Sequence, residues 1–311
     1  METLFVIVSL LAGALLAVQA GANAQLSKAT GSPFVATALQ LSVGALGLLL
    51  IAVLTGTVAA LALLPHAPWW HAIGGVASAL YVVSTIVLFP RLGAVVTVGL
   101  FIAGQMFASL TLDSFGWFGL TPKTLDAATL FGTLAVVLGA AGIVFGQPGT
   151  SWAQQSQQIE GKLGWMALAL VAGAVLPVQG ALNALLRADL GAPFVVGTVS
   201  FLVATLAMAA VQLVITTVED APKSPAGGVA QMAWWGWLGG FAGATYVTTM
   251  FTAIPVIGAA AAVGLTVAGQ QVASVFVDRY GCFRLPKRPV PGLRLAGVAA
   301  LLVGVTLIQL F

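Results

Sequence analysis

Charged residues are scarce in this chain: 11 Lys and Arg and 8 Asp and Glu make up 6% of its 311 residues, while hydrophobic residues make up 60%. A soluble globular protein usually has about 25% charged residues. So few charges cannot cover a water-facing surface, so the composition excludes that class and predicts an integral membrane protein. The basic excess lies mostly in one short loop beside apolar segments, which indicates membrane topology rather than nucleic-acid binding.

Cysteine and histidine are nearly absent as well. Cys282 is the single cysteine, which excludes an internal disulfide, and His66 and His71 are the only histidines. The two histidines share one loop without a cysteine or acidic neighbour close by, so we expect no metal site. Nucleophile triads and nucleotide-binding motifs are missing from the sequence. We therefore expect no catalytic residue and no cofactor, and an intramembrane enzyme is the less supported alternative.

Apolar runs of about 20 residues recur along the whole chain, which is the length an α-helix needs to cross a bilayer. A β-barrel would instead show short alternating segments. The runs and their helix breakers predict an all-α protein with ten transmembrane helices, at about 3–24, 34–62, 70–89, 93–112, 126–146, 163–186, 193–217, 234–253, 257–277 and 292–311. The second range is too long for one straight crossing and predicts a tilt or a turn before Pro65. The third is expected to stop at Pro90.

The sequence contains two copies of one unit. Residues 11–35 and 171–195 share 13 identities in 25 positions, and residues 74–116 and 239–281 share 19 in 43. Such a duplication fixes the architecture before single elements are assigned. We expect a first five-helix repeat at 1–147, a polar linker at 148–162 and a second five-helix repeat at 163–311.

An odd number of helices per copy places the two copies in opposite orientations in the membrane. Inverted repeats are the common construction of secondary transporters, because the halves can exchange conformations around a central site. The alternative is that duplication only builds a stable bundle. Residues 1–24 resemble a secretory signal, but Glu2 and the internal recurrence of the segment at 163–186 favour a retained first helix.

The distribution of basic residues predicts orientation. With the N-terminus outside, only Lys123 and Arg187 fall in outer loops. The inner loops then hold Lys28, Arg91, Lys162, Lys223, Arg279, Arg284, Lys287, Arg288 and Arg294.

Polar residues recur at equivalent positions of the two copies and form stripes on the predicted helices. Spacings of four and eight residues place such side chains on one helix face. Polar groups inside a membrane span face the bundle interior or a hydrated cavity, so we expect these residues to bind substrate, with interhelical hydrogen bonding as the alternative. The candidate residues are Gln19, Asn23, Tyr81, Gln105 and Ser109 in the first copy and Gln179, Asn183, Tyr246, Gln270 and Ser274 in the second.

Asp, Glu, Lys and Arg are missing from the middle of every predicted span. A shared carboxylate for proton and cation exchange is therefore not expected, and a neutral or zwitterionic substrate fits better. Asp113 and Asp278 fall at span ends, each followed by a turn glycine, and we interpret them as boundary residues.

These motifs resemble the YdcZ-like branch of the drug/metabolite transporter superfamily. The resemblance rests on Gln-x-x-x-Asn in the first helix, the following Gly-x-Pro-Phe, Pro-x-x-Gly after the third helix and Gly-Gln followed by Asp-x-x-Gly in the fourth, in both copies. Members are often single five-helix proteins that pair antiparallel, and this chain looks like the fused form. The resemblance implies a ten-helix transporter with a central cavity, but no particular substrate. Many relatives in the wider superfamily have cytoplasmic termini, opposite to the charge count, so both orientations stay open.

We therefore expect an inner-membrane secondary transporter of small polar or amphipathic metabolites, embedded in the lipid bilayer and without a nucleic-acid partner. One chain holds both repeats, so a monomer is expected to suffice, with a homodimer as the alternative. A membrane protein for assembly or regulation, without transport, is the rival function.

The single cysteine makes the orientation testable. If the basic loop is cytoplasmic, Cys282 should resist a membrane-impermeant maleimide in intact cells and react once the cells are opened. Labelling of Cys282 in intact cells would reverse the assignment.

Overall fold

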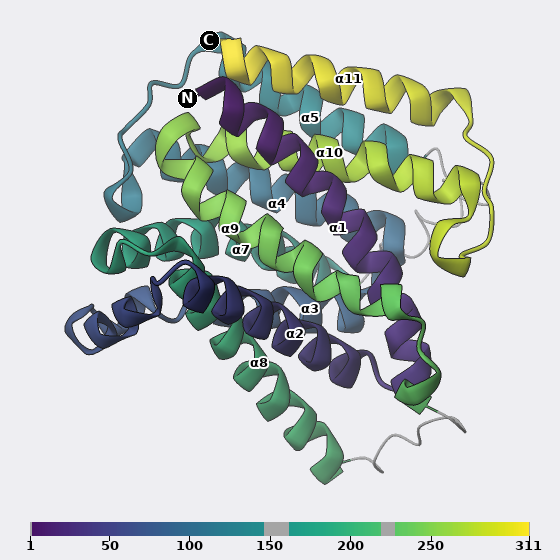
Figure 1. Ribbon diagram of the computed structural model, residues 1–311. Helices are drawn as coiled ribbons and strands as arrows, with labels where there is room; N and C mark the ends of the chain where they lie inside the picture. Colours follow the sequence, from purple (N-terminus) through teal and green to yellow (C-terminus); the bar gives the residue numbers. More distant parts are fainter. Residues whose placement is uncertain (1, 146–161, 219–227, 311) are drawn as a thin grey trace.

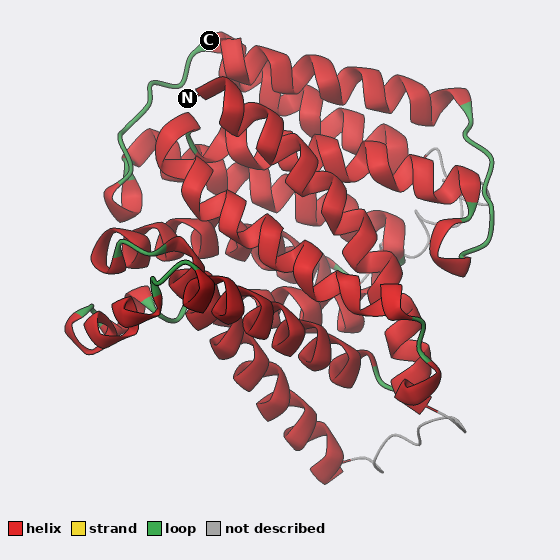
Figure 2. Ribbon diagram, viewed as in Figure 1, coloured by secondary structure: helices red, strands yellow, loops and turns green. Residues whose placement is uncertain are grey.

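The computed structural model describes residues 2–145, 162–218 and 228–310. Within these ranges the chain forms ten long α-helices and short 3₁₀ helices, and it has no strand (Figure 2). The first half contains α1 Glu2–Thr30, α2 Pro33–Leu54, α3 Gly74–Leu92, α4 Ala94–Phe115 and α5 Ala127–Phe145. The second half contains α7 Leu163–Leu190, α8 Pro193–Val218, α9 Leu238–Ile257, α10 Ala259–Tyr280 and α11 Gly292–Leu310. Residues 148–161 of the expected linker lie outside the described ranges.

Local sequence sets the helix ends. The Ser32 side chain accepts a hydrogen bond from the Val35 amide and Pro33 begins α2, which is a standard N-terminal pattern. Gly116 ends α4 and Gly281 ends α10 in the left-handed conformation that glycine adopts without strain. Before α5, the Thr129 amide donates to Asp126, and this hydrogen bond holds the pKa of the Asp126 carboxyl below its usual range.

Several helix ends differ from the prediction: α1 continues from the expected end at 24 to Thr30, and α7 continues from 186 to Leu190. The range 34–62 contains the turn expected before Pro65: α2 ends at Leu54, because Thr55 bonds back to the Ile51 carbonyl and Gly56 has a φ of 69°. A 3₁₀ helix, Val58–His66, follows it. The expected stop at Pro90 also fails: α3 continues to Leu92, and Gly93, with a φ of 79°, ends it.

The helices of the two halves pack in an exchange-symmetric pattern: each main contact between the halves has an equivalent contact in which the two halves are exchanged. α1 packs on α9 and α10, and its counterpart α7 packs on α3 and α4. α2 packs on α8, and α5 packs on α11, so each of these helices meets its own counterpart. The α5 and α11 pair forms one edge of the bundle, and α2 and α8 lie toward the opposite edge (Figure 1).

Counterpart helices run antiparallel where they meet. A Cβ built on Gly132 would contact Gly304 and Ile308, and one built on Gly139 would contact Gly297, so the numbering falls on α11 as it rises on α5. The same order relates α2 and α8, where Gly44 meets Phe201 and Gly197 meets Leu48. Within the described residues, the halves are therefore arranged with opposite helix directions.

Glycines that recur in both halves make very close helix contacts. A Cβ on Gly13 of α1 would lie 2.0 Å from the Thr266 carbonyl oxygen of α10, and one on Gly104 of α4 would lie 2.0 Å from the Leu170 carbonyl oxygen of α7. Gly269 and Gly173 make the reciprocal contacts with Leu10 and Phe101. The backbones of α1 and α10, and of α4 and α7, are in direct contact, as small residues permit in membrane bundles.

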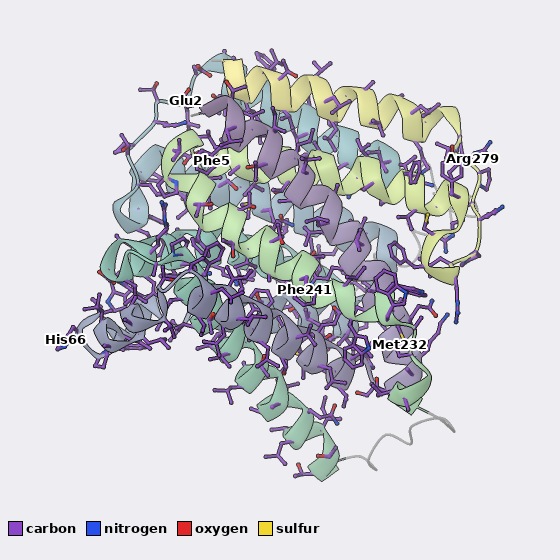
Figure 3. The ribbon with its side chains drawn as sticks, viewed as in Figure 1. Glu2, Phe5, His66, Met232, Phe241 and Arg279 are labelled. Carbon is purple, nitrogen blue, oxygen red and sulfur yellow. The ribbon has the colours of Figure 1, made fainter. Side chains whose placement is uncertain are left out.

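Among the residues that the structure describes, eight helical segments are long and apolar enough to cross a membrane. The apolar parts of α5 and α11 are shorter, at Ala127–Ile143 and Gly292–Ile308. Glu2 and His66 lie at one end of the bundle, and Met232 and Arg279 lie at the other (Figure 3). Apolar side chains cover much of the outer surface, among them Leu206, Phe107 and Leu213.

The glycine contacts predict a large cost for added volume. Gly104→Ala should lower the unfolding free energy by about 1–3 kcal/mol, because its methyl group would overlap the α7 backbone. Gly164→Ala in α7 is the matched control, since a Cβ there has no described atom within 4 Å. Melting temperatures of the two purified variants test this, and equal values would contradict the contact.

Candidate functional site

The second-half amides form a packed polar cluster. Ser78 of α3 donates to Gln179 of α7 at 2.9 Å, and Gln179 and Asn183 both donate to Ser200 of α8, at 3.4 and 3.0 Å. A Cβ on Gly74 would lie 2.4 Å from the Asn183 side-chain oxygen, so this oxygen packs closely against α3 although it accepts no hydrogen bond among the described residues. Gln179 and Asn183 therefore join three helices, which agrees with the interhelical alternative.

The first-half amides are arranged differently. Asn23 of α1 donates to Thr37 of α2 at 3.3 Å, and its carbonyl oxygen, like that of Asn183, has no partner in the described part of the chain. Gln19 lies against Gly243, the counterpart of Ser78, where a Cβ would be 2.6 Å from its amide nitrogen. Gln40, the counterpart of Ser200, lies against Gly239. Ser78 and Ser200 are thus replaced by Gly243 and Gln40, and Gln19 loses its serine partner.

Three predicted amides have no protein partner. Among residues 2–145, 162–218 and 228–310, the side chains of Gln19, Gln105 and Gln270 form no hydrogen bond. Gln105 is 5% exposed, so its amide lies inside the bundle with its hydrogen-bonding capacity unused. An unpaired amide in such a place is free to bind a substrate or water.

The two tyrosines lie near each other, while the two serines bond to their own helices. Tyr246 and Tyr81 are close enough to interact electrostatically, and the Tyr81 ring contacts Phe101. Ser109 donates to the Gln105 carbonyl, and Ser274 donates to the Gln271 carbonyl. The hydroxyl protons of the serines are thus engaged, and the tyrosines are the predicted residues that meet across the two halves.

Asp113 is more than a boundary residue. Its carboxylate accepts hydrogen bonds from the amides of Ala259 and Ala260, both at 2.7 Å, at the start of α10. Lys123 donates to the carbonyl of Ile257, the last residue of α9, at 2.8 Å. A carboxylate is stabilised by the positive end of a helix, so these contacts hold the turn between α9 and α10 against the end of α4.

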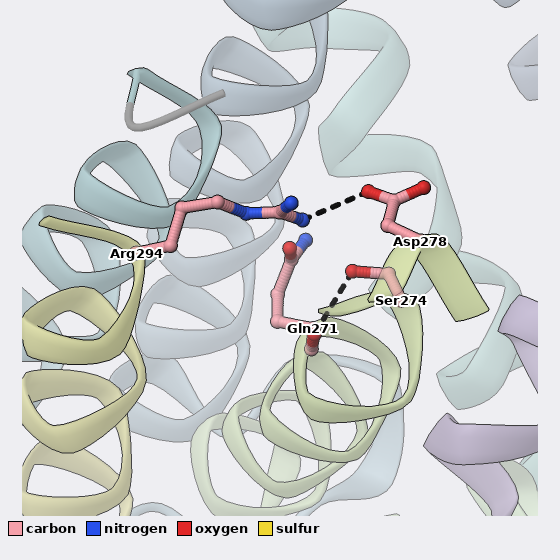
Figure 4. A network of polar contacts seen from close by, with 4 residues as sticks. All are labelled: Gln271, Ser274, Asp278 and Arg294. Atoms are coloured by element: carbon pink, nitrogen blue, oxygen red, sulfur yellow. Dashed lines mark hydrogen bonds and ion pairs between the residues drawn. The ribbon is translucent and has the colours of Figure 1, made fainter. Parts of the chain in front are cut away.

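Asp278, the counterpart of Asp113, has another partner. Arg294, in the first turn of α11, donates to its carboxylate at 2.9 Å and reaches across Gln271 of α10 (Figure 4). The Arg294 side chain is fully buried, and its Nε and Nη1 have no partner among the described residues. Arg294 was counted with the basic residues of an inner loop, but it lies in the first turn of α11 and is buried in the bundle.

Two cavities lie away from the ten predicted site residues. One, of about 350 Å³, is lined by Asp113, Lys123, Thr129 and apolar side chains of α4, α9, α10 and α11. The other, of about 180 Å³, is lined between α2, α8 and α9 by Thr245, Thr248, Thr249, Thr252 and apolar neighbours. None of the ten predicted site residues lines either cavity. The threonine stripe was detectable in the sequence from its helical spacing, but it was missed because the first repeat lacks it.

The expectation that the histidines have no acidic neighbour was wrong. His71 pairs with Asp189 at the end of α7, because the fold brings together residues far apart in the chain. No group of three metal-ligating side chains occurs in the residues that the structure describes.

The comparison with protein families decides the identity of the chain. The family described as "Putative inner membrane exporter, YdcZ" matches residues 4–142 and again residues 164–307. The chain belongs to the YdcZ family. It is a multi-pass inner-membrane protein that carries the YdcZ unit twice, as the sequence motifs predicted.

A solved structure also resembles this YdcZ protein. The structure, described as "Crystal structure of protein", has a TM-score of 0.69 and 16% sequence identity, covering 99% of this chain and 97% of that chain. At this identity the likeness shows the fold alone. No curated protein matches the sequence.

The contrast between Gln19 and Gln179 predicts different roles. Gln179→Leu should lower the unfolding free energy by about 1 kcal/mol, because it removes the bonds to Ser78 and Ser200. Gln19→Leu loses no protein bond and should change stability less. Melting temperatures of both variants of this YdcZ protein test the contrast, and a larger loss for Gln19→Leu would contradict it.

Proposed function

We propose that this YdcZ protein exports small polar or amphipathic metabolites across the inner membrane by alternating access of two inverted five-helix repeats. The observation that carries the proposal is the exchange-symmetric packing in which counterpart helices run antiparallel. Such halves can exchange conformations, and the exchange opens a central site to each side in turn. The YdcZ family description as an exporter supports the direction.

The proposal includes ten membrane spans, with α5 and α11 among them. Each has 19 residues, which is about 28 Å of helix at 1.5 Å per residue and close to the thickness of the hydrocarbon core. Both are apolar and each packs against its counterpart. With five spans per repeat, a single chain contains both halves of the transport path, so a monomer is sufficient.

Gln19, Gln105 and Gln270 are the residues that we assign to the path, together with Tyr81 and Tyr246. Unpaired amides and hydroxyls can donate and accept hydrogen bonds. Such a lining suits a neutral or zwitterionic substrate with mixed polar groups. Gln179 and Asn183 have a structural role in this scheme, because Gln179 bonds to Ser78 and Ser200 and Asn183 donates to Ser200 within the protein.

Metabolite profiles of cells that overexpress or lack the protein identify candidate substrates, and flux into proteoliposomes tests them. Gln105→Leu and Gln270→Leu should each reduce flux at least about tenfold, because one lost hydrogen bond to a polar substrate is worth about 1.4 kcal/mol. Thr306→Val on the exposed face of α11 is the control and should transport normally.

The outcomes separate the rival functions. Normal flux in both Leu variants would remove these glutamines from the path. Absence of flux for every metabolite whose cellular level responds to the protein would favour a non-transporting assembly or regulatory role.

A further inference from the structure

The ends of α4 and α10 are equivalent in sequence but differ in contacts. In both, the backbone carbonyl of the aspartate accepts a hydrogen bond from a backbone amide in the following loop. The Lys123 amide donates to Asp113 at 2.7 Å, and the Arg288 amide donates to Asp278 at 2.8 Å. The loops are therefore built alike. The carboxylates differ, because Asp113 binds the first amides of α10 whereas Asp278 binds Arg294 of α11.

Two pairs of equivalent glycines also differ in their surroundings between the two ends. A Cβ on Gly258, before α10, would lie 2.7 Å from Lys123 Nζ and 3.1 Å from an Asp113 oxygen, whereas one on Gly93, before α4, has no described atom within 4 Å. A Cβ on Gly264 would contact Val305 and Ile308 of α11 and Met106 of α4. One on Gly99, its counterpart, again has no described atom within 4 Å.

Burial follows this pattern along both helices. Residues 259–268 of α10 are all buried. In α4, the counterparts Val96, Val98, Gly99 and Leu100 are only partly buried, whereas Thr97, Phe101 and Ile102 are buried. Along α4 and α10, packing is therefore tighter at the Asp113 end, beside the cavity of about 350 Å³, and looser at the Asp278 end. Because α4 and α10 are antiparallel, these are opposite ends.

We propose that Asp113 and Asp278 are the two gates of the transport cycle, and that the structure shows the Asp113 gate closed and the Asp278 gate open. A closed gate is a carboxylate of one half bound to the first amides of the helix of the other half. In the alternate state Asp278 leaves Arg294 and binds the start of α4, while Asp113 leaves α10. The inference rests on the proposed function and deepens it by naming its gates.

Each released carboxylate has a cation to receive it. A buried carboxylate without a partner is costly, so gate opening needs a second site for the charge. Arg294 provides it for Asp278. For Asp113, the cavity of about 350 Å³ holds Lys123 and Thr129, and Thr129 is the counterpart of Arg294. In the proposed cycle, each carboxylate thus has hydrogen-bond donors in both states: helix amides when its gate is closed and a basic side chain when its gate is open.

The test measures the gates without any substrate. The substitutions Gly99→Cys and Gly264→Cys are introduced singly into a Cys282→Ser protein, and the reaction rate of each new thiol with N-ethylmaleimide is measured in lipid nanodiscs. Both sites accept a Cβ, since Gly264 has only ordinary contacts, the nearest at 3.5 Å. The Gly99→Cys protein should react faster than the Gly264→Cys protein, because water reaches the loosely packed end.

The gate variants should shift the two rates in opposite directions. Asp113→Asn weakens the closed gate, because its amide NH₂ faces one of the two α10 amides; Arg294→Thr releases Asp278 to bind α4. Both should raise the labelling ratio, defined as the rate at position 264 divided by the rate at position 99, about tenfold, which is about 1.4 kcal/mol. Asp278→Asn cannot close its gate and should lower the ratio.

Other results would overturn the assignment. If Asp113→Asn and Asp278→Asn leave the ratio unchanged, or move it in the same direction, the carboxylates are structural caps rather than gates. Melting temperatures identify variants that are merely unfolded, and Arg294→Gln then replaces Arg294→Thr. Opposite shifts without flux would support the gates but reject transport, whereas normal flux without shifts would reject the gates alone.

Discussion

Contact between the backbones of the two halves is the constraint on which the rest of the structure depends. Gly13 with Thr266, and Gly104 with Leu170, leave no room for side chains between α1 and α10 or between α4 and α7. These contacts lie at the middle of α4 and α10, while Asp113 and Asp278 lie near their ends. A helix held tightly at its centre can tilt with little change there and a large change at both ends. In the proposed cycle, α4 and α10 thus tilt about the glycine contacts. When one end of each helix moves toward its neighbour, the other end moves away.

The duplicated sequence predicted most of the fold. The identities around Gln19 and Gln179, and around Asp113 and Asp278, gave the helix order and the matching family region in each half. Helix ends were less predictable, because they depend on single residues: Gly56 shortens α2, whereas Pro90 is tolerated within the last turn of α3. The antiparallel pairing of α5 with α11 could not be derived from hydropathy, since both helices are apolar around much of their circumference.

The candidate site was predicted as a set of residue types but not as an arrangement. Gln19 and Gln179 lie in matching sequence motifs, yet only Gln179 has serine partners, because Ser78 has Gly243 as its counterpart. Pattern analysis of one helix cannot detect such an exchange on a neighbouring helix. For the same reason it missed the Asp113 contacts with α10 and the pairing of His71 with Asp189, which join residues more than 100 positions apart.

Fusion of the repeats allows the two ends to become chemically different. In an antiparallel homodimer of identical chains both gates contain the same residues, so the protein itself gives neither state an energetic advantage. Here Arg294 and Gln271 have Thr129 and Met106 as their counterparts. A hydrogen bond to a charged group contributes about 1.5–3 kcal/mol, which is a factor of roughly 10 to 150 in a two-state equilibrium. The Asp278–Arg294 pair therefore favours the state with this gate open, and no equivalent cation at position 129 favours the opening of the Asp113 gate.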